Sequence, residues 1–174
     1  MNRVTIDPVW LMHIQKPARY IGGEWNSIVK DHEQIPVKVA LAFPDVYEVA
    51  MSHLGLKIIY SVLNARDDAL AERVYAPWVD MEAMMKEKHI PLFTLESKCP
   101  VKDFDVLGFT MPYEMCYTNI LNMIHMAGIP VWAKDRTDED PIVVSGGPCV
   151  YNAEPVADFF DVFFIGESEE AIGE

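Results

Sequence analysis

Short apolar runs recur along the chain and are separated by segments of helical length. The clearest runs are residues 37–43 and 104–110. Two further runs, 142–144 and 162–165, are bounded by turn residues, which is typical of strands covered on both faces. A shorter strand is predicted at residues 73–76. These runs give the strands of the expected sheet.

Between these runs, apolar residues recur at helical spacing. Ser52 is expected to cap a helix that continues to about Ala65. Asp80 is expected to cap a second helix. A third helix is expected over about residues 117–128, where it ends at a glycine. Residues 91–95 predict an additional edge strand. Strands and helices therefore alternate along the chain.

Strands joined by helical crossovers form parallel sheets. The sequence therefore predicts an α/β fold, a Rossmann-like three-layer sandwich with a mainly parallel sheet of about five strands. We expect residues 35–174 to form this domain and residues 1–34 to form an arm packed on it.

The loops after the core strands carry the candidate binding residues, because ligands of open parallel sheets bind at the carboxyl ends of the strands. Loops 44–54, 110–118, 146–152 and 166–168 should therefore converge at one edge. The candidate contacts in these loops are Asp45, Tyr47, His53, Thr110, Tyr113, Gly146 and Gly147.

Composition narrows the class of protein. Apolar residues make up 51% of the 174 residues, which excludes a disordered chain. The formal net charge of −13 disfavours direct binding to a nucleic-acid backbone. The apolar runs are far shorter than the ~20 residues of a membrane-spanning helix, and the N-terminus lacks the pattern of a secretory signal. We expect a cytoplasmic domain that binds neither nucleic acid nor membrane.

Several chemistries are not predicted. Cys99, Cys116 and Cys149 are far apart in the sequence, so they are expected to be reduced, mostly buried thiols rather than ligands of zinc or an iron–sulfur cluster. The glycines do not form a dinucleotide-binding or nucleophile-elbow pattern. The acidic residues near the end of the chain are expected to begin a helix, where negative charge is favourable; they are Glu167, Glu169 and Glu170. No catalytic or metal-binding residue is assigned.

Three stretches near the end carry a resemblance: Ser-Gly-Gly-Pro at 145–148, Asn-Ala-Glu-Pro at 152–155 and Ile-Gly-Glu-Ser-Glu-Glu at 165–170. Together they resemble the end of the cobalamin-binding-type domain that precedes the catalytic domain in many radical-SAM enzymes. The string at 16–26 resembles the N-terminal signature of an uncharacterised subfamily of such proteins.

The resemblance implies an accessory cofactor- or substrate-binding domain without a complete active site. Its partner would be the protein's own radical-SAM domain, expected after the helix that begins near Glu167. The [4Fe–4S] cluster and S-adenosylmethionine are expected only in that downstream domain, while cobalamin could bind here. Two alternatives stay open: a scaffold or interaction module that keeps the fold but binds no cofactor, and a free-standing flavodoxin-like binding protein.

The loop after the first strand departs from the family pattern. Many cobalamin domains carry Asp-x-His-x-x-Gly, whose histidine is the lower ligand of cobalt. Here the matching positions are Asp45, Tyr47 and Ala50. A neutral phenol, with a pKa near ~10, replaces imidazole poorly as a metal ligand, so we expect Tyr47 not to coordinate cobalt. His53 is either a ligand contact or a structural histidine bonded to the backbone near a helix start.

The arm allows two interpretations. In one, it simply packs on the domain, with Tyr20 and Trp25 as aromatic anchors. In the other, three polar residues reach a neighbouring domain or a bound substrate; these are Arg19, Glu24 and Asn26.

Overall fold

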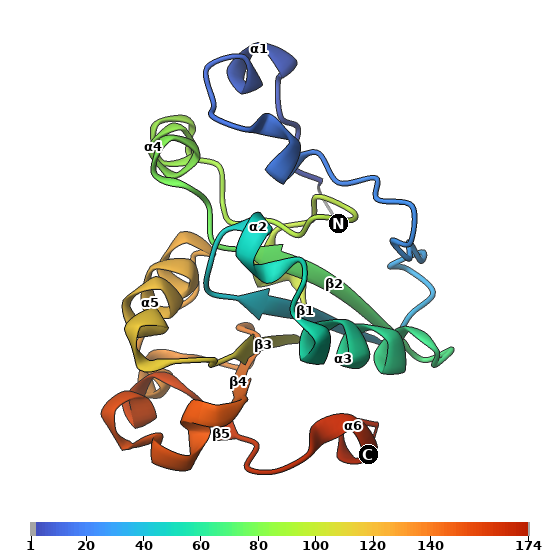
Figure 1. Cartoon of the computed structure of the whole chain (residues 1–174), viewed down its shortest axis with the longest axis vertical. Helices are drawn as coiled ribbons and strands as arrows, with labels where there is room; N and C mark the ends of the chain where they lie inside the picture. The colour runs from blue at the N-terminus through green and yellow to red at the C-terminus, as the bar shows by residue number, and fades with distance from the viewer. Residues whose placement is uncertain (1–2, 174) are drawn as a thin grey trace.

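One parallel sheet organises the structure, a computed structural model that describes residues 3–173 without the side chains of residues 169 and 170. Within these residues the sheet has five strands in the order β2-β1-β3-β4-β5, as seen from top to bottom in Figure 1. The strands are β1 Val37–Phe43, β2 Ala69–Tyr75, β3 Val106–Thr110, β4 Ile142–Gly146 and β5 Val162–Phe163. All four pairings are parallel. The predicted α/β fold with a parallel sheet of about five strands is confirmed, and the order is flavodoxin-like.

Helices cover both faces of this sheet. The α-helices are α1 Pro8–Leu11, α2 Tyr47–Ala50, α3 Leu54–Asn64, α4 Val79–Lys88, α5 Tyr117–Met126 and α6 Ser168–Ala171. Short 3-10 helices are η1 Pro17–Tyr20, η2 Val101–Asp103, η3 Glu114–Cys116, η4 Ala133–Asp135, η5 Pro148–Asn152 and η6 Glu154–Phe159. Helix α3 packs on one face, with α6 beside it, and α4 and α5 pack on the other. Within residues 3–173, no helix is long and apolar enough to cross a membrane.

Strand β1 shows how the two faces of the core form. Val39, Leu41 and Phe43 belong to the cluster under α3, whereas Ala40 and Ala42 belong to the cluster under α4 and α5. All five are buried. Successive side chains of a strand point to opposite faces of the sheet. A central strand with apolar residues on both faces must therefore be covered on both faces.

Two predicted helix caps are wrong. Helix α3 is capped by His53, whose Nδ1 accepts the Leu56 amide proton at 3.2 Å, while the Ser52 hydroxyl turns back to the Val49 carbonyl. Helix α4 begins one residue before the predicted cap Asp80, whose carboxylate instead accepts the amide proton of Gln15 in the arm at 2.6 Å. Local propensity identified both helices but neither the residue that caps α3 nor the distant partner of Asp80.

Two predicted strands also differ from the structure. The strand expected at 73–76 is the seven-residue β2, Ala69–Tyr75. The edge strand expected at 91–95 is absent within the described residues, where Phe93 forms only an isolated antiparallel bridge with Pro100. The segment pairs with its own loop, where Thr94 donates its N–H to the Cys99 carbonyl at 3.0 Å, and it contacts β2 through the bond from the Leu95 N–H to the Arg73 carbonyl at 2.7 Å.

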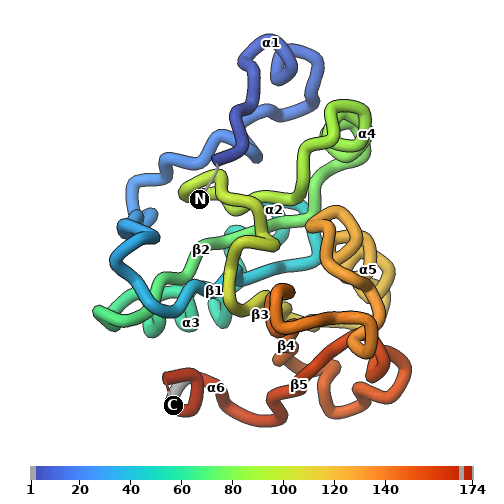
Figure 2. The backbone as a smooth tube through the Cα atoms, turned by 180° about the vertical axis from the view of Figure 1, so that it is seen from behind, coloured from blue at the N-terminus to red at the C-terminus, as the bar shows by residue number. Residues whose placement is uncertain are grey.

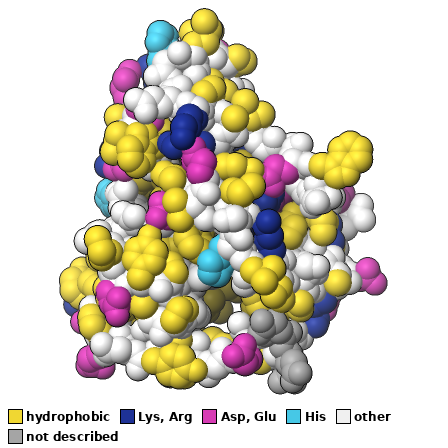
Figure 3. Space-filling model, in the orientation of Figure 1, with side chains coloured by type: hydrophobic (Ala, Val, Ile, Leu, Met, Phe, Trp, Pro, Cys, Tyr) yellow, Lys and Arg dark blue, Asp and Glu magenta, His cyan; other side chains and the backbone are white. Residues whose placement is uncertain are grey.

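The end of the sheet is less covered than expected. Val162 in β5 is 51% exposed and Ile165 after it is 61% exposed, so a strand covered on both faces is a wrong prediction here. β5 is a two-residue edge strand, reached through the 3-10 helices η5 and η6 rather than one helix. Hydrophobic side chains reach the surface over much of the face drawn in Figure 3. β5 nevertheless pairs in parallel with β4, and Figure 2 shows it beyond β4 at the end of the strand order. The helix expected to begin near Glu167 is α6. The side chains of Glu169 and Glu170, and residues 1, 2 and 174, lie outside the described part of the chain.

The outer edge of β2 is closed by side chains instead of another strand. Asn64 at the end of α3 both donates to the Ala71 carbonyl at 2.9 Å and accepts the Ala71 amide proton at 3.1 Å. Lys30 from the arm donates to the carbonyl of Ala69 at 2.7 Å. Free backbone groups on an edge strand invite pairing with other chains. These contacts block such pairing.

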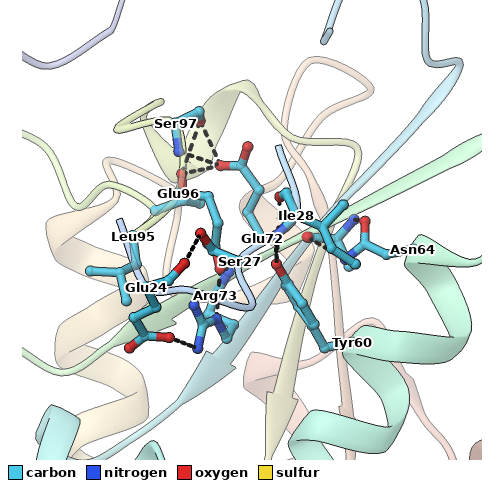
Figure 4. A network of polar contacts seen from close by, with 12 residues as sticks. Glu24, Ser27, Ile28, Tyr60, Asn64, Glu72, Arg73, Leu95, Glu96 and Ser97 are labelled. Atoms are coloured by element: carbon cyan, nitrogen blue, oxygen red, sulfur yellow. Dashed lines mark hydrogen bonds and ion pairs between the residues drawn. The ribbon is translucent and has the colours of Figure 1, made fainter. Parts of the chain in front are cut away.

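The same edge carries buried charges. Arg73 bonds Glu96 at 2.6 Å through Nε and Glu24 at 2.6 Å through Nη1, and its guanidinium lies 5.1 Å from the ring centre of Tyr60 (Figure 4). Glu96 is fully buried. Although burial opposes the charge of Arg73, its acidic partners keep its pKa above the ordinary value. The arm is therefore held to β2 by a satisfied charge network.

Its neighbour Glu72 is also fully buried and points to the other face. The Glu72 carboxylate lies 2.8 Å from Nε2 of His32 in the arm and accepts hydrogen bonds from the hydroxyls of Thr94 and Ser97, each at 2.5 Å. Two adjacent residues of β2 thus bind two separate segments of the chain.

Replacement of Asn64 by alanine should expose the Ala71 backbone groups of β2. Two hydrogen bonds are lost and both buried backbone groups lose their partner, so the free energy of unfolding should fall by about 2–4 kcal/mol. Urea denaturation measures this change. Asn122→Ala, in α5, is the matched control, because its side chain makes only a long contact to sulfur, and it should change stability by less than about 1 kcal/mol. Equal stability of the two variants would contradict the role given to Asn64.

Candidate ligand-binding cleft

The loops after β1, β3 and β4 meet at the carboxyl edge of the sheet. The Tyr113 hydroxyl donates to the Asp45 carboxylate at 2.7 Å, which joins the β3 loop to the β1 loop. The Met111 amide donates to the Gly146 carbonyl at 2.8 Å, which joins the β3 loop to the end of β4. These bonds place the candidate loops side by side.

A cleft of about 320 Å³ opens beside these loops, on the α3 side of the sheet. Its apolar walls come from strands, from α3 and from the segment around α6; they are Leu41, Leu56, Ile59, Val144, Val162, Phe164 and Ile172. Its polar lining residues are His53, Thr110, Ser145 and Ser168. Among its described lining residues there is no Asp, Glu, Lys or Arg. The cleft is therefore suited to an uncharged group.

Glycines shape this cleft in different ways. Gly146 lies in open surroundings, since a Cβ added there would meet only the Phe164 carbonyl, at 4.0 Å. Gly147 has φ +102°, and an added Cβ would lie 3.0 Å from the Met111 carbonyl oxygen. Gly147 therefore permits a close backbone approach. Gly108 leaves the middle of β3 without a side chain, so no side chain extends from the sheet into the cleft at that point.

His53 lines the cleft at the start of α3. Besides accepting the Leu56 amide proton, its ring packs against Phe43, with 4.9 Å between ring centres. Burial lowers the pKa of His53 from its ordinary value, so the ring is neutral at neutral pH. It has the structural role that the sequence suggested and also lies where a ligand could reach it.

Tyr47 does not line the cleft. Its hydroxyl donates a short hydrogen bond to Glu24, and its ring lies edge-on to Tyr75 with 5.6 Å between centres. Burial, together with the hydrogen bond to Glu24, raises the pKa of Tyr47 to about 12. The phenol is protonated at neutral pH and is already bound within the protein.

Of the seven candidate contacts, four line the cleft: His53, Thr110, Gly146 and Gly147. Asp45 and Tyr113 are instead bonded to each other. Sequence reasoning missed Leu41, Gly108, Ser145, Ser168 and Ile172. The glycine inside a strand was the available signal, since such a residue often marks a close approach of a ligand or backbone.

The polar residues of the arm mainly bind the domain itself. Arg19 bonds Glu48 at 2.8 Å and lies 5.6 Å from the ring centre of Trp78. Glu24 bonds Arg73, as described above, whereas Asn26 is exposed. Contact with a neighbouring domain or substrate stays a proposal for all three.

The two aromatic residues of the arm behave differently. Tyr20 is buried and accepts the amide proton of Trp78 at 3.0 Å, so it does anchor the arm. Trp25 is 99% exposed, so its expected role as an anchor is wrong. Glu24, next to it, occupies the inward position.

The cysteines do not gather into a metal site. Within the described residues, no group of three or more His, Cys, Asp or Glu side chains is placed to hold a metal ion. Cys99 and Cys116 are buried and Cys149 is half-buried. Burial raises the pKa of Cys116 and of Cys149, so both thiols are protonated at neutral pH.

Comparison with known proteins places this fold and cleft in a family. The family model described as "Radical SAM proteins, N-terminal" matches residues 55–174, which include α3 except its first residue, all of β2 to β5 and most of the cleft lining. The chain is also similar to the uncharacterized protein MJ0966 of Methanocaldococcus jannaschii, with 29% identity over 134 residues, 75% of this chain and 24% of that protein. It spans about a quarter of the length of this curated relative. The match of the family model over more than half of the chain shows that the protein belongs to the family of radical SAM N-terminal domains.

Proposed function

We propose that this domain binds a cofactor or substrate for a radical-SAM iron–sulfur oxidoreductase and carries no complete active site itself. The observation that supports this most is the cleft at the carboxyl edge of the sheet, where open parallel sheets bind ligands. Its walls are apolar and its polar groups are few, as in small-molecule sites generally.

The chemistry would then belong to a radical-SAM domain of the same protein. We propose that this partner domain holds the [4Fe–4S] cluster on a Cys-x-x-x-Cys-x-x-Cys motif and binds S-adenosylmethionine. The family supports this assignment. The cysteines here do not suit the cluster, because Cys99, Cys116 and Cys149 are far apart in the sequence, and within the described residues they join no group of three or more side chains placed to hold a metal ion.

Cobalamin is the cofactor that the resemblance suggests, and the residues fit it in part. The cleft would take an apolar portion of the cofactor between α3 and the wall formed by β3 and β4. Thr110, Gly146 and His53 would provide its polar contacts. A lower cobalt ligand is not provided by Tyr47, whose protonated hydroxyl is bonded to Glu24. Cobalamin supplies radical chemistry when bound.

A scaffold that binds no cofactor is the second candidate. Exposed apolar side chains in the loops at the carboxyl edge favour it, because exposed apolar surface often marks a protein contact. These are Val49, Trp78, Tyr113, Met115 and Tyr151. In this case the loops would contact the partner domain and the cleft would take no small molecule.

Filling the cleft should separate the two candidates. Gly146→Val adds a side chain where the nearest atom to an added Cβ is 4.0 Å away. If the cleft takes the uncharged base at the end of the nucleotide tail of cobalamin, hydroxocobalamin should bind the wild-type protein, and the variant should bind at least ~10-fold more weakly, a loss of about 1.4 kcal/mol. Isothermal titration calorimetry measures both dissociation constants.

Two controls sharpen this experiment. Ala65→Val enlarges an exposed residue outside the cleft and should bind as the wild type does. Cobinamide, which lacks the nucleotide tail, should bind equally to wild type and Gly146→Val. Absence of hydroxocobalamin binding to the wild-type protein would remove cobalamin from the proposal, and a cleft that also binds no other small molecule would favour the scaffold.

The lower-ligand position gives a separate prediction. Because Tyr47 is protonated and bonded to Glu24, Tyr47→Phe should leave the visible absorption bands of bound hydroxocobalamin unchanged. Loss of the hydrogen bond to Glu24 should lower stability by about 1 kcal/mol, which urea denaturation detects. A shift of the cobalt bands in this variant would show that Tyr47 contacts the metal.

A further inference from the structure

Two contacts hold the ring of His53 in the cleft, and a third neighbour leaves room for it. Nδ1 accepts the Leu56 amide proton at 3.2 Å, and Phe43 packs against the ring face. Gly55 gives the ring room, because a Cβ there would lie 3.2 Å from Cε1 of His53. A side chain held in this way offers a fixed polar group to a ligand.

The capping bond also decides which nitrogen of His53 carries the proton. A neutral imidazole has one N–H donor and one acceptor nitrogen. Nδ1 is the acceptor in the α3 cap, so the proton is on Nε2. The lowered pKa of His53 keeps the ring in this neutral form at neutral pH. Within residues 3–173, Nε2 makes no hydrogen bond to another protein group, which leaves this donor available.

The other groups around the cleft limit the charge of its ligand. Its walls are apolar and its described lining has no acidic or basic side chain. The Ser145 hydroxyl already donates to the Phe109 carbonyl at 3.2 Å. Burying a charged group without a partner costs several kcal/mol. An ion would therefore be excluded, and a neutral apolar group with one acceptor would be favoured.

We propose that His53 recognises the ligand of this cleft through its Nε2–H, and that the ligand inserts an uncharged, mainly apolar group bearing a hydrogen-bond acceptor such as a ring nitrogen or carbonyl. This inference rests on the proposed ligand-binding function and adds the ligand class and the residue that selects it. Because Nε2 is protonated, His53 acts here as a hydrogen-bond donor and not as a metal ligand.

Two probes of nearly the same shape test this proposal. Quinoline and naphthalene are both planar and uncharged at pH 7.5, but only quinoline has a ring-nitrogen acceptor. Protein NMR titrations, followed through the amides of Gly108 and Gly146, give the dissociation constant and show that binding occurs in the cleft. Quinoline should bind about 3- to 10-fold more tightly than naphthalene, as expected for one net hydrogen bond. Quinoline-2-carboxylate should bind at least tenfold more weakly than quinoline because of its charge.

The variant His53→Ser separates the donor from the cap. Serine is among the best N-cap residues, so α3 and the unfolding temperature should be kept, while the Nε2–H is lost and the short hydroxyl stays at the cap. Quinoline and naphthalene should then bind with equal affinity. Ser52→Ala, which leaves both the cap and the cleft lining unchanged, should keep the wild-type difference.

Each other outcome counts against a particular statement. Equal binding of quinoline and naphthalene to the wild-type protein, or a difference that persists in His53→Ser, overturns the role of His53 while leaving a ligand-binding cleft. Tighter binding of quinoline-2-carboxylate overturns the ligand class. If none of the probes shifts the cleft amides, the proposed ligand-binding function fails, and this inference fails with it.

Discussion

The burial of two adjacent charged residues in an edge strand constrains much of this fold. Glu72 and Arg73 in β2 are both buried, and a buried charge without partners is strongly destabilising. Their partners come from the N-terminal arm and from the segment after α4. The two charges therefore determine where these irregular segments lie, and the segments in turn cover the edge of the sheet (Figure 4).

The charge network reaches the loop after β1 through one carboxylate. Glu24 bonds Arg73 on one side and the Tyr47 hydroxyl on the other. Tyr47 begins α2, four residues after the end of β1. Its engagement with Glu24 keeps it out of the cleft lining. The contact that fixes the arm therefore also decides what the loop after β1 can offer to a ligand.

The cleft itself follows from uneven cover of the sheet. Helix α3 packs on β1 and β2. The short α6 contacts α3 on the same side of the sheet. Between them the wall is formed by β3 and β4, where glycines at 108 and 146 leave little side-chain bulk. The apolar walls, the few polar groups and the fixed histidine of this cleft are the features that support the proposed ligand-binding function. Membership in the family of radical SAM N-terminal domains is consistent with such a function.

The sequence by itself determined the strand and helix order, because hydrophobic periodicity and turn residues are local signals. It also placed Asp45, Thr110 and Gly146 at one edge, since all strands of a parallel sheet end there. Only the tertiary structure decided which loop residues face the cleft, where the Asp80 carboxylate binds, and that β5 is a partly exposed edge. These depend on contacts between segments far apart in the chain, such as Glu24 with Tyr47 and Gln15 with Asp80. No local pattern encodes such pairs, because their energy exists only once the fold brings them together.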